Sequence, residues 1–232
     1  MKAAAVGQGP GGSDYAYGDK PAVYVSSYDA FRFTNWLHNG QGSGDTETGA
    51  YTLLGGSPIP SNGLSITRNP NATWFIPSED EWYKAAYHKN DGDTGNYWDY
   101  PTSSDAVPDN NLPSSDTGNS ANFNPGPYTT GDIFHPLTDA GSYTLSVSPY
   151  GTFDQGGSVW EWTEGVIDSS LRGIRGGSWE WQSTQLASSD RTPQGPTAEG
   201  SDIGFRVASI PEPTTFVLTT IGLVGLGCRR RK

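Results

Sequence analysis

The sequence predicts one α+β domain that is irregular and rich in loops, followed by a short C-terminal tail. Three observations lead to this prediction. The 232 residues include 31 glycines and 17 prolines, which interrupt regular elements along the whole chain. Two segments combine a helical pattern of apolar residues with an N-terminal capping signal. Aromatic residues make up 12% of the chain, so we expect Trp and Tyr side chains to anchor short elements in the core. The length is sufficient for one sizeable core, and we divide the chain into a loop-like N-terminal remnant (1–20), a domain (21–208) and a tail (209–232).

The first helix is expected after an extended stretch at 21–25. Ser26 can cap it, with Asp29 three residues further on, and Gly40 ends it. The inward stripe is formed by Tyr28, Phe31, Trp36 and Leu37. Residues 40–72 then predict loops or a small hairpin, without recognisable chemistry.

The second helix is expected within residues 75–89, with Ser78 as its N-cap and Glu81 at the third position. Its inward residues are Trp82, Ala85 and Ala86. Glu79 and Glu81 resemble a catalytic carboxylate pair, but residues two apart on a helix do not share a face. We therefore favour capping and helix-dipole roles for them. Loops follow up to residue 120, with an aromatic cluster at Tyr97, Trp98 and Tyr100, and then turns and short strands.

Charge and cysteine content exclude some classes of function. The net charge of -11 would repel phosphate backbones, so nucleic acid is not expected as a partner. The same charge would attract cations, although acidity can also simply keep an exported protein soluble. Cys228 is the only cysteine, which excludes an internal disulfide and leaves metal ions as candidate cross-links for the loops.

The tail combines three elements in an order that is typical of a sorting signal. A Pro-Glu-Pro sequence precedes an apolar run at 214–228 that is shorter than the roughly 20 residues of a spanning helix, and cations follow. The residues that define the signal are Pro211, Glu212, Pro213, Arg229, Arg230 and Arg231. The positive-inside rule keeps these cations in the cytoplasm and the domain outside.

This arrangement resembles the PEP-CTERM signal of bacteria. The resemblance implies cleavage by an exosortase-type processing protease, transient membrane contact through the tail, and export to the cell surface or extracellular matrix. A plain short anchor is the alternative. Residues 1–17 contain no apolar export segment, so we expect the natural N-terminus to lie further upstream and the domain to be N-terminally truncated.

A frame of motifs fills the C-terminal part of the domain: DQGGSVWEWTEG from Asp154, RGIRGGSWEW from Arg172, a single Arg191, and IGFRV from Ile203. The frame resembles the formylglycine-generating enzyme (sulfatase-modifying factor) family. The IPSEDEWY segment of the second helix also matches a motif of that family. The resemblance implies the irregular, loop-rich fold of that family, a relative of the C-type lectin fold.

Oxygen-rich loops in this frame predict calcium sites. Asp154 and Glu161 offer carboxylates, while Gly156 and Gly157 allow the backbone to turn its carbonyls inward. The resemblance implies calcium ligands at Asp154, Gly157, Val159 and Glu161, and fainter ones at Asn122, Phe123, Asp132 and Phe134. The alternatives are a carboxylate satisfied by backbone amides at the first site and ordinary turn residues at the second.

The cysteine pair of the family enzyme is missing. Its positions correspond to Trp181 and Leu186, and neither an indole nor an alkyl chain replaces a thiolate as copper ligand and redox group. Copper, formylglycine formation, a catalytic residue and an organic cofactor are therefore not expected. We expect Arg175, Arg191 and Arg206 to act as scaffold. Iron chemistry of the related sulfoxide synthases is not expected either, because His38, His88 and His135 are far apart in the sequence.

These observations favour an exported, calcium-stabilised module that binds a ligand or builds a structure and does not catalyse a reaction. Trp179 and Trp181 are candidates for a ligand surface toward a glycan or a protein, with core packing as the alternative for each. A divergent oxidase with unrecognised metal ligands and a structural matrix protein without a small ligand are the other hypotheses.

Overall fold

Short helices and strands separated by long loops make up the computed structural model, which describes residues 17–124 and 136–210. The α-helices are α1 (Ser27–His38) and α2 (Glu79–Tyr87). The strands are β1 (Trp74–Phe75), β2 (Trp160–Val166), β3 (Arg172–Arg175), β4 (Thr192–Gln194), β5 (Ile203–Phe205) and β6 (Ala208–Ser209). Single 3-10 turns are η2 (Tyr17–Asp19), η3 (Gly63–Ser65), η4 (Pro113–Ser115) and η5 (Ser183–Leu186). The predicted α+β, loop-rich class is confirmed.

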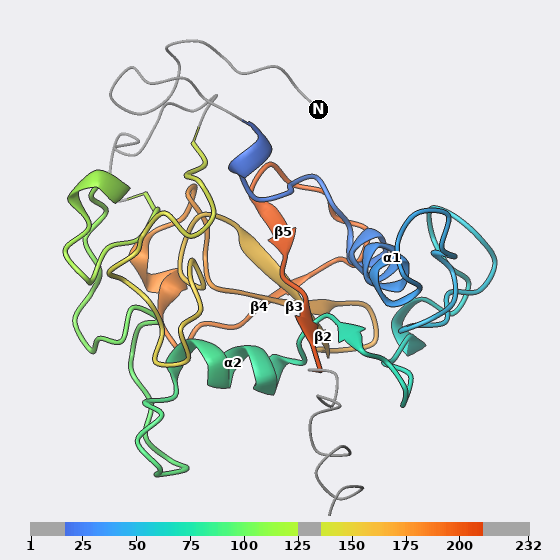
Figure 1. The fold of residues 1–232 in the computed structure, drawn as a ribbon, viewed down its shortest axis with the longest axis horizontal. Coiled ribbons are helices and arrows are strands. Elements are labelled where there is room, and N and C mark those ends of the chain that lie inside the picture. Colours follow the sequence, from blue (N-terminus) through green and yellow to red (C-terminus); the bar gives the residue numbers. More distant parts are fainter. Residues whose placement is uncertain (1–16, 125–135, 211–232) are drawn as a thin grey trace, which may run out of the picture.

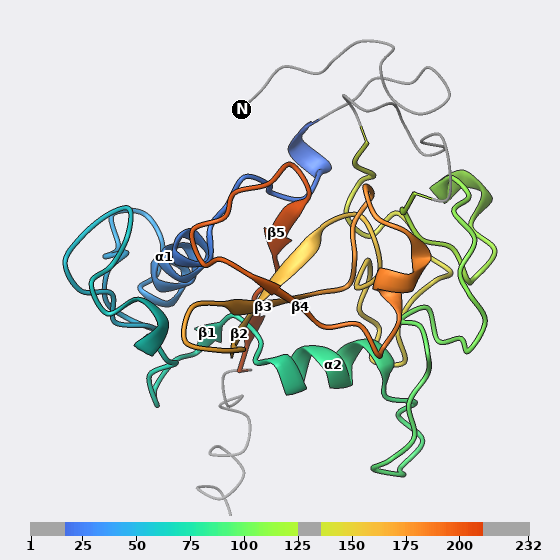
Figure 2. The same ribbon diagram turned by 180° about the vertical axis from the view of Figure 1, so that it is seen from behind.

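Two small sheets organise these strands. The larger one has the order β4-β3-β2-β5, in which β2 pairs antiparallel with β3 and parallel with β5. The smaller one pairs β1 with β6, so the last strand of the domain lies beside a strand from the first half of the chain. Figures 1 and 2 show the loops of residues 88–124 and 136–159 on one side of the sheet and α1 on the other.

Helix α1 begins and ends as its sequence predicts. The Ser26 hydroxyl accepts the Asp29 amide at 3.2 Å, and the Asp29 carboxylate accepts the Ser26 amide at 3.0 Å. Tyr28 and Phe31 are buried as expected, whereas Trp36 and Leu37 are only half-buried. The second half of the inward face carries Asn35, whose side chain bonds the Thr46 carbonyl and the Tyr51 amide. The helix therefore organises the loop that follows it.

Helix α2 has the second predicted capping box. The Ser78 hydroxyl accepts the Glu81 amide at 3.2 Å, and the Glu81 carboxylate accepts the Ser78 amide at 2.7 Å. Trp82 and Ala86 are buried, whereas Ala85 is half-buried, because the inward face continues to Tyr87 instead. Packing of α2 against β2 places Trp82 beside the sheet.

A buried arginine fastens the loops around η3 to the sheet. Arg172, on β3, is fully buried and donates to the carbonyls of Gly63, Ile66 and Glu164. Its guanidinium lies 4.9 Å from the centre of the Phe31 ring. Burial lowers the pKa of this arginine, which nevertheless stays charged because its ordinary pKa is so high. Charge-assisted bonds to backbone carbonyls thus replace a carboxylate partner.

The expected extended stretch at 21–25 contains no strand. Tyr24 has a φ of 58°, and its amide donates to the Gly200 carbonyl. The segment therefore contacts the loop before β5 and does not pair as a strand in a sheet. Within the described ranges, no helix is long and apolar enough to cross a membrane.

Candidate functional site

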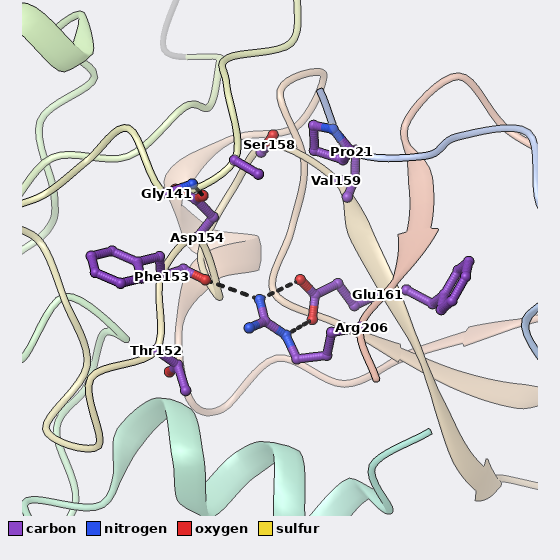
Figure 3. A pocket seen from close by; sticks show the side chains of 11 residues that line it. Pro21, Gly141, Thr152, Phe153, Asp154, Ser158, Val159, Glu161 and Arg206 are labelled. Atoms are coloured by element: carbon purple, nitrogen blue, oxygen red, sulfur yellow. Dashed lines mark hydrogen bonds and ion pairs between the residues drawn. The ribbon is translucent and has the colours of Figure 1, made fainter. Parts of the chain in front are cut away.

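An open cavity of about 410 Å³ lies where the chain enters β2. Asp154, Ser158, Val159 and Glu161 line it, together with Arg206 from the segment after β5 (Figure 3). The backbone reaches this position through left-handed conformations, with φ of 55° at Asp154, 77° at Gly157 and 59° at Ser158. Such conformations are strained for residues that carry a Cβ and concentrate at functional sites.

Gly157 is required at this turn by close packing as well as by its φ. A Cβ at this position would lie 2.3 Å from the carbonyl oxygen of Asn122. That carbonyl accepts the Ser158 amide at 2.7 Å, and the Gly157 amide donates to Gly176 at 2.8 Å. The turn is thereby held between the segment of Asn122 and the Gly176–Gly177 pair after β3.

The Glu161 carboxylate is bound by the chain itself. Arg206 donates to both of its oxygens, through Nη2 to Oε1 at 2.5 Å and through Nε to Oε2. The indole nitrogen of Trp82 donates to Oε2 at 2.6 Å, and Arg206 also donates to the Phe153 carbonyl at 3.1 Å. Figure 3 shows the guanidinium between Glu161 and the loop that carries Phe153 and Asp154. The predicted scaffold role of Arg206 is confirmed by these bonds.

Asp154 brings a second carboxylate to the cavity. Its Oδ2 accepts the Gly141 amide at 2.5 Å. Burial raises the pKa of this carboxyl above its usual range, and the bond from Gly141 and the charge of Arg206 oppose the shift. The lining therefore holds two carboxylates against one guanidinium, a net negative charge in partly desolvated surroundings. The Ser158 hydroxyl is buried and has no hydrogen-bond partner within residues 17–124 and 136–210.

The structure brings together most of the first predicted calcium set. Asp154, Val159 and Glu161 line one cavity, and Gly157 lies in the turn between them. Carboxylate and carbonyl oxygens are the donors that calcium takes, so these residue types fit the ion at Asp154. Glu161 can contribute only by sharing an oxygen with Arg206. Among the described residues, no three His, Cys, Asp or Glu side chains gather into a metal cluster.

The second predicted calcium set is only partly visible. Asn122 is buried, and its side-chain amide donates to the Pro136 carbonyl at 2.9 Å. The Phe123 carbonyl accepts the side chain of Asn110 at 2.6 Å. Asp132 and Phe134 lie outside the described residues. The set therefore stays a prediction.

The two positions that correspond to the family's cysteines differ in their surroundings. Trp181 keeps 49% of its surface exposed, whereas Leu186 is fully buried and packs with Ala121 and Phe123. Trp179, expected on the same ligand surface as Trp181, is a core residue with 5% exposure that packs against Leu137 and Val159. The prediction of Trp179 as a surface residue was wrong, because the chain turns after β3 and directs this indole inward.

Glu79 has a role that the sequence did not reveal. It accepts hydrogen bonds from Arg175 at 2.5 Å and from Arg191 at 2.6 Å, and so joins α2 to β3 and to the segment before β4. Burial would raise the pKa of Glu79, but the bonds from Arg191 and Arg175 outweigh burial and lower it. The scaffold role of the two arginines is confirmed. Glu81 keeps the predicted capping role and also pairs with Arg68 at 2.6 Å.

The histidines lie at structural positions. His38 is the last residue of α1, and its Nδ1 accepts the Thr73 amide at 3.2 Å. His88 is the C-cap of α2; its Nε2 lies 2.6 Å from the Asp93 carbonyl, and its Nδ1 accepts the Asn90 amide at 3.1 Å. His135 lies outside the described residues.

Comparison with known structures found similar proteins, and two with a TM-score above 0.5 support the fold. Treponema denticola variable protein 1 is 21% identical over 89% of this chain and 79% of its own, with a TM-score of 0.58. The crystal structure of CarF is 25% identical over 84% of this chain and 69% of its own, with a TM-score of 0.56. PvdO from Pseudomonas aeruginosa is 20% identical over 82% of this chain and 62% of its own, with a TM-score of 0.46. No curated protein sequence matches this chain.

Comparison with protein families covers nearly the whole chain. Residues 209–232 match the PEP-CTERM protein-sorting motif, which confirms the sorting signal, with export and recognition by exosortase-type processing as its consequence. That motif lies almost entirely outside the described residues. Residues 4–210 match the sulfatase-modifying factor enzyme 1-like domain. Together with the fold and the motif frame around β2 and β3, this match shows that the chain belongs to the sulfatase-modifying factor (formylglycine-generating enzyme) family.

Proposed function

We propose that this exported chain is a non-catalytic binding module stabilised by calcium. The observation that carries the proposal is the surroundings of Trp181 and Leu186. One position presents an indole to solvent, and the other is filled by an aliphatic side chain in the core. Thiolate chemistry has no side chain to act through at either position.

The cavity at the start of β2 supports the calcium part of the proposal. Its lining is net negative, and it contains a desolvated carboxylate at Asp154. A bound cation would compensate this charge, and the side-chain oxygen of Asp154 with the carbonyls of Gly157 and Val159 would hold it. Calcium would supply no chemistry there beyond linking loops that lack a disulfide.

Trp181 is the proposed centre of the ligand surface. Large amphipathic rings at the surface bind sugar rings and protein partners with little loss of conformational entropy. The carbonyl of Trp181 accepts the Asn124 amide at 2.8 Å, so its backbone is fixed while its ring stays exposed. A glycan or a protein surface is the class of ligand that this ring fits.

Elemental analysis of the exported protein with its natural N-terminus, purified without chelator, tests the absence of a redox centre. We expect about one or two calcium ions per chain, as loop sites of this type bind, and no copper or iron. Stoichiometric copper or iron would refute the proposal and favour the divergent oxidase.

A Trp181→Ala variant tests the ligand surface. In a glycan and surface-protein binding screen, we expect it to lose the binding of the wild type while its melting temperature is unchanged, because 49% of the residue is exposed to solvent. Trp179→Ala is the matched comparison and should lose stability as a core residue. Retained binding by the Trp181→Ala variant would place the ligand elsewhere.

A further inference from the structure

The folded domain and the sorting motif meet without a spacer. The motif match begins at Ser209, which is the second residue of β6 and pairs with Trp74 of β1. The next amide, that of Ile210, donates to the Thr73 carbonyl at 3.0 Å. Pro211, the first residue of the Pro-Glu-Pro sequence, follows directly. The start of the signal is therefore part of the smaller sheet.

Chain geometry limits how far the cleavage signal can be from this sheet. An extended chain covers at most about 3.6 Å per residue, so Pro211 to Pro213 lie within about 11 Å of Ile210. An enzyme that holds these residues in its active site must approach the domain at the position where β6 ends. The described chain ends at that edge, next to the two-stranded sheet (Figure 1).

The surface at this edge consists of Thr73, Trp74, Ser209 and Ile210, which we name the β1–β6 face. The register places Trp74 and Ser209 on one side of the pleat and Thr73 and Ile210 on the other. Ile210 is an aliphatic residue with 58% of its surface exposed, and Ser209 is also exposed. Trp74 is half-buried, and Phe75, on the opposite side of the pleat, is buried. The face thus offers one apolar side chain on each side of the strand end, Trp74 and Ile210, to a protein partner that encloses the end of β6.

The face is also held in place by the core beneath it. Ala208 packs against the cluster that contains Phe31 of α1 and Phe75 of β1. His38, at the end of α1, accepts the amide of Thr73. Release of β6 would break the pairing with β1 and uncover Ala208. A protease that contacts the domain while β6 stays paired with β1 leaves these interactions intact.

We propose that the exosortase-type protease docks on the β1–β6 face while it processes the PEP-CTERM motif. The folded domain is then a second recognition element beside the tail. The proposal depends on the sorting motif and the fold, and it is independent of calcium and of the Trp181 surface.

A spacer variant tests the proposal in cells that carry the processing protease. A short Gly-Ser segment is inserted between Ile210 and Pro211 of the full chain with its natural export signal, and the rate of conversion to the mature mass is followed by pulse-chase. A flexible spacer lowers the effective concentration of the face, so we expect processing several-fold slower than in the wild type. The same segment inserted after Ser170, in an exposed turn, is the control and should be processed normally.

A second variant distinguishes an effect of the β1–β6 face on processing from an effect of the sequence around the cleavage site. Trp74 is remote from the tail in sequence and reaches the protease only through the fold. Trp74→Thr should slow processing in the native chain and have no additional effect in the spacer variant. Trp98→Thr, which changes another half-buried indole, is the control, and melting temperatures show that each variant is folded. Unchanged or faster processing of the spacer variant, or normal processing of a folded Trp74→Thr variant, would overturn the proposal.

Discussion

Arg206 donates to both carboxylate oxygens of Glu161, and the two residues join the segment after β5 to the start of β2. The pair is largely shielded from solvent, with side-chain exposures of 24% for Arg206 and 7% for Glu161. The interaction is therefore stronger than an exposed ion pair, and loss of one partner leaves the other charge buried.

Glu161→Gln should lower the free energy of unfolding by about 3–5 kcal/mol, because Arg206 loses its partner in a desolvated position. Urea unfolding in the presence of a chelator measures the effect without a contribution from metal. The double variant Glu161→Gln, Arg206→Met should lose less than the sum of the single losses, since it leaves no unpaired charge. A loss below about 1 kcal/mol would show that the pair behaves as an exposed one.

Asp154→Asn should raise the melting temperature of the metal-free protein at neutral pH. The pKa of Asp154 is raised in the folded state, so its ionised form opposes folding as the pH rises above the ordinary value of 3.8. The amide removes this cost. If calcium binds there, the variant should gain less stability from added calcium than the wild type does. Scanning calorimetry with chelator and with calcium measures both effects, and equal gains in the two proteins would place calcium elsewhere.

Glu79→Gln should cost about 2 kcal/mol at neutral pH, the order expected for hydrogen bonds to a charged group. The folded-state pKa of Glu79 is lowered, so its contribution is present above the ordinary value of 4.5 and is lost as the pH falls through the folded-state value. The stability of the wild type should therefore fall more steeply in acid than that of the variant. Denaturant unfolding from neutral pH to pH ~3 tests this difference. Asp80→Asn, at the exposed neighbouring position of the same helical turn, is the control and should change the profile little.

Gly157→Ala should unfold the domain or lower its free energy of unfolding by more than about 3 kcal/mol. The added methyl group would collide with the backbone of Asn122, and alanine would have to adopt a left-handed φ at this position. Gly151→Ala is a matched control, since Gly151 has nearly the same φ of 75° and open space around its Cβ position. It should cost only about 1 kcal/mol of conformational strain. Equal losses in thermal unfolding would show that strain, and not the contact with Asn122, makes glycine necessary at 157.

The sequence predicted well what depends on neighbouring residues. Both capping boxes, at Ser26 with Asp29 and at Ser78 with Glu81, involve side chains three residues apart, and the structure contains both. The class of the fold and the sorting motif were also predicted, because composition and motif order carry them.

The sequence did not predict interactions between distant residues. Glu79 lies 96 residues from Arg175 and 112 from Arg191, and no local pattern joins them. Trp179 and Trp181 are two residues apart and would share a face on an extended segment, so only the turn after β3 separates a buried Trp179 from an exposed Trp181. Asp154 and Glu161 were expected to meet, but Arg206 came to the same cavity from a motif that predicted only a scaffold role.

The pairing of β5 with β2 and of β6 with β1 also determines when the domain can fold during synthesis. Both sheets need strands from residues 203–209. Without β5, β2 would be the edge strand of its sheet, paired with β3 on one side and unpaired on the other. A growing chain that has not yet added these residues exposes the β2 edge and leaves Trp160 and Trp162 without Ile203 beside them. Folding can therefore finish only after nearly the whole domain has been translated, and a chain cut short before Ile203 should be prone to aggregation and proteolysis.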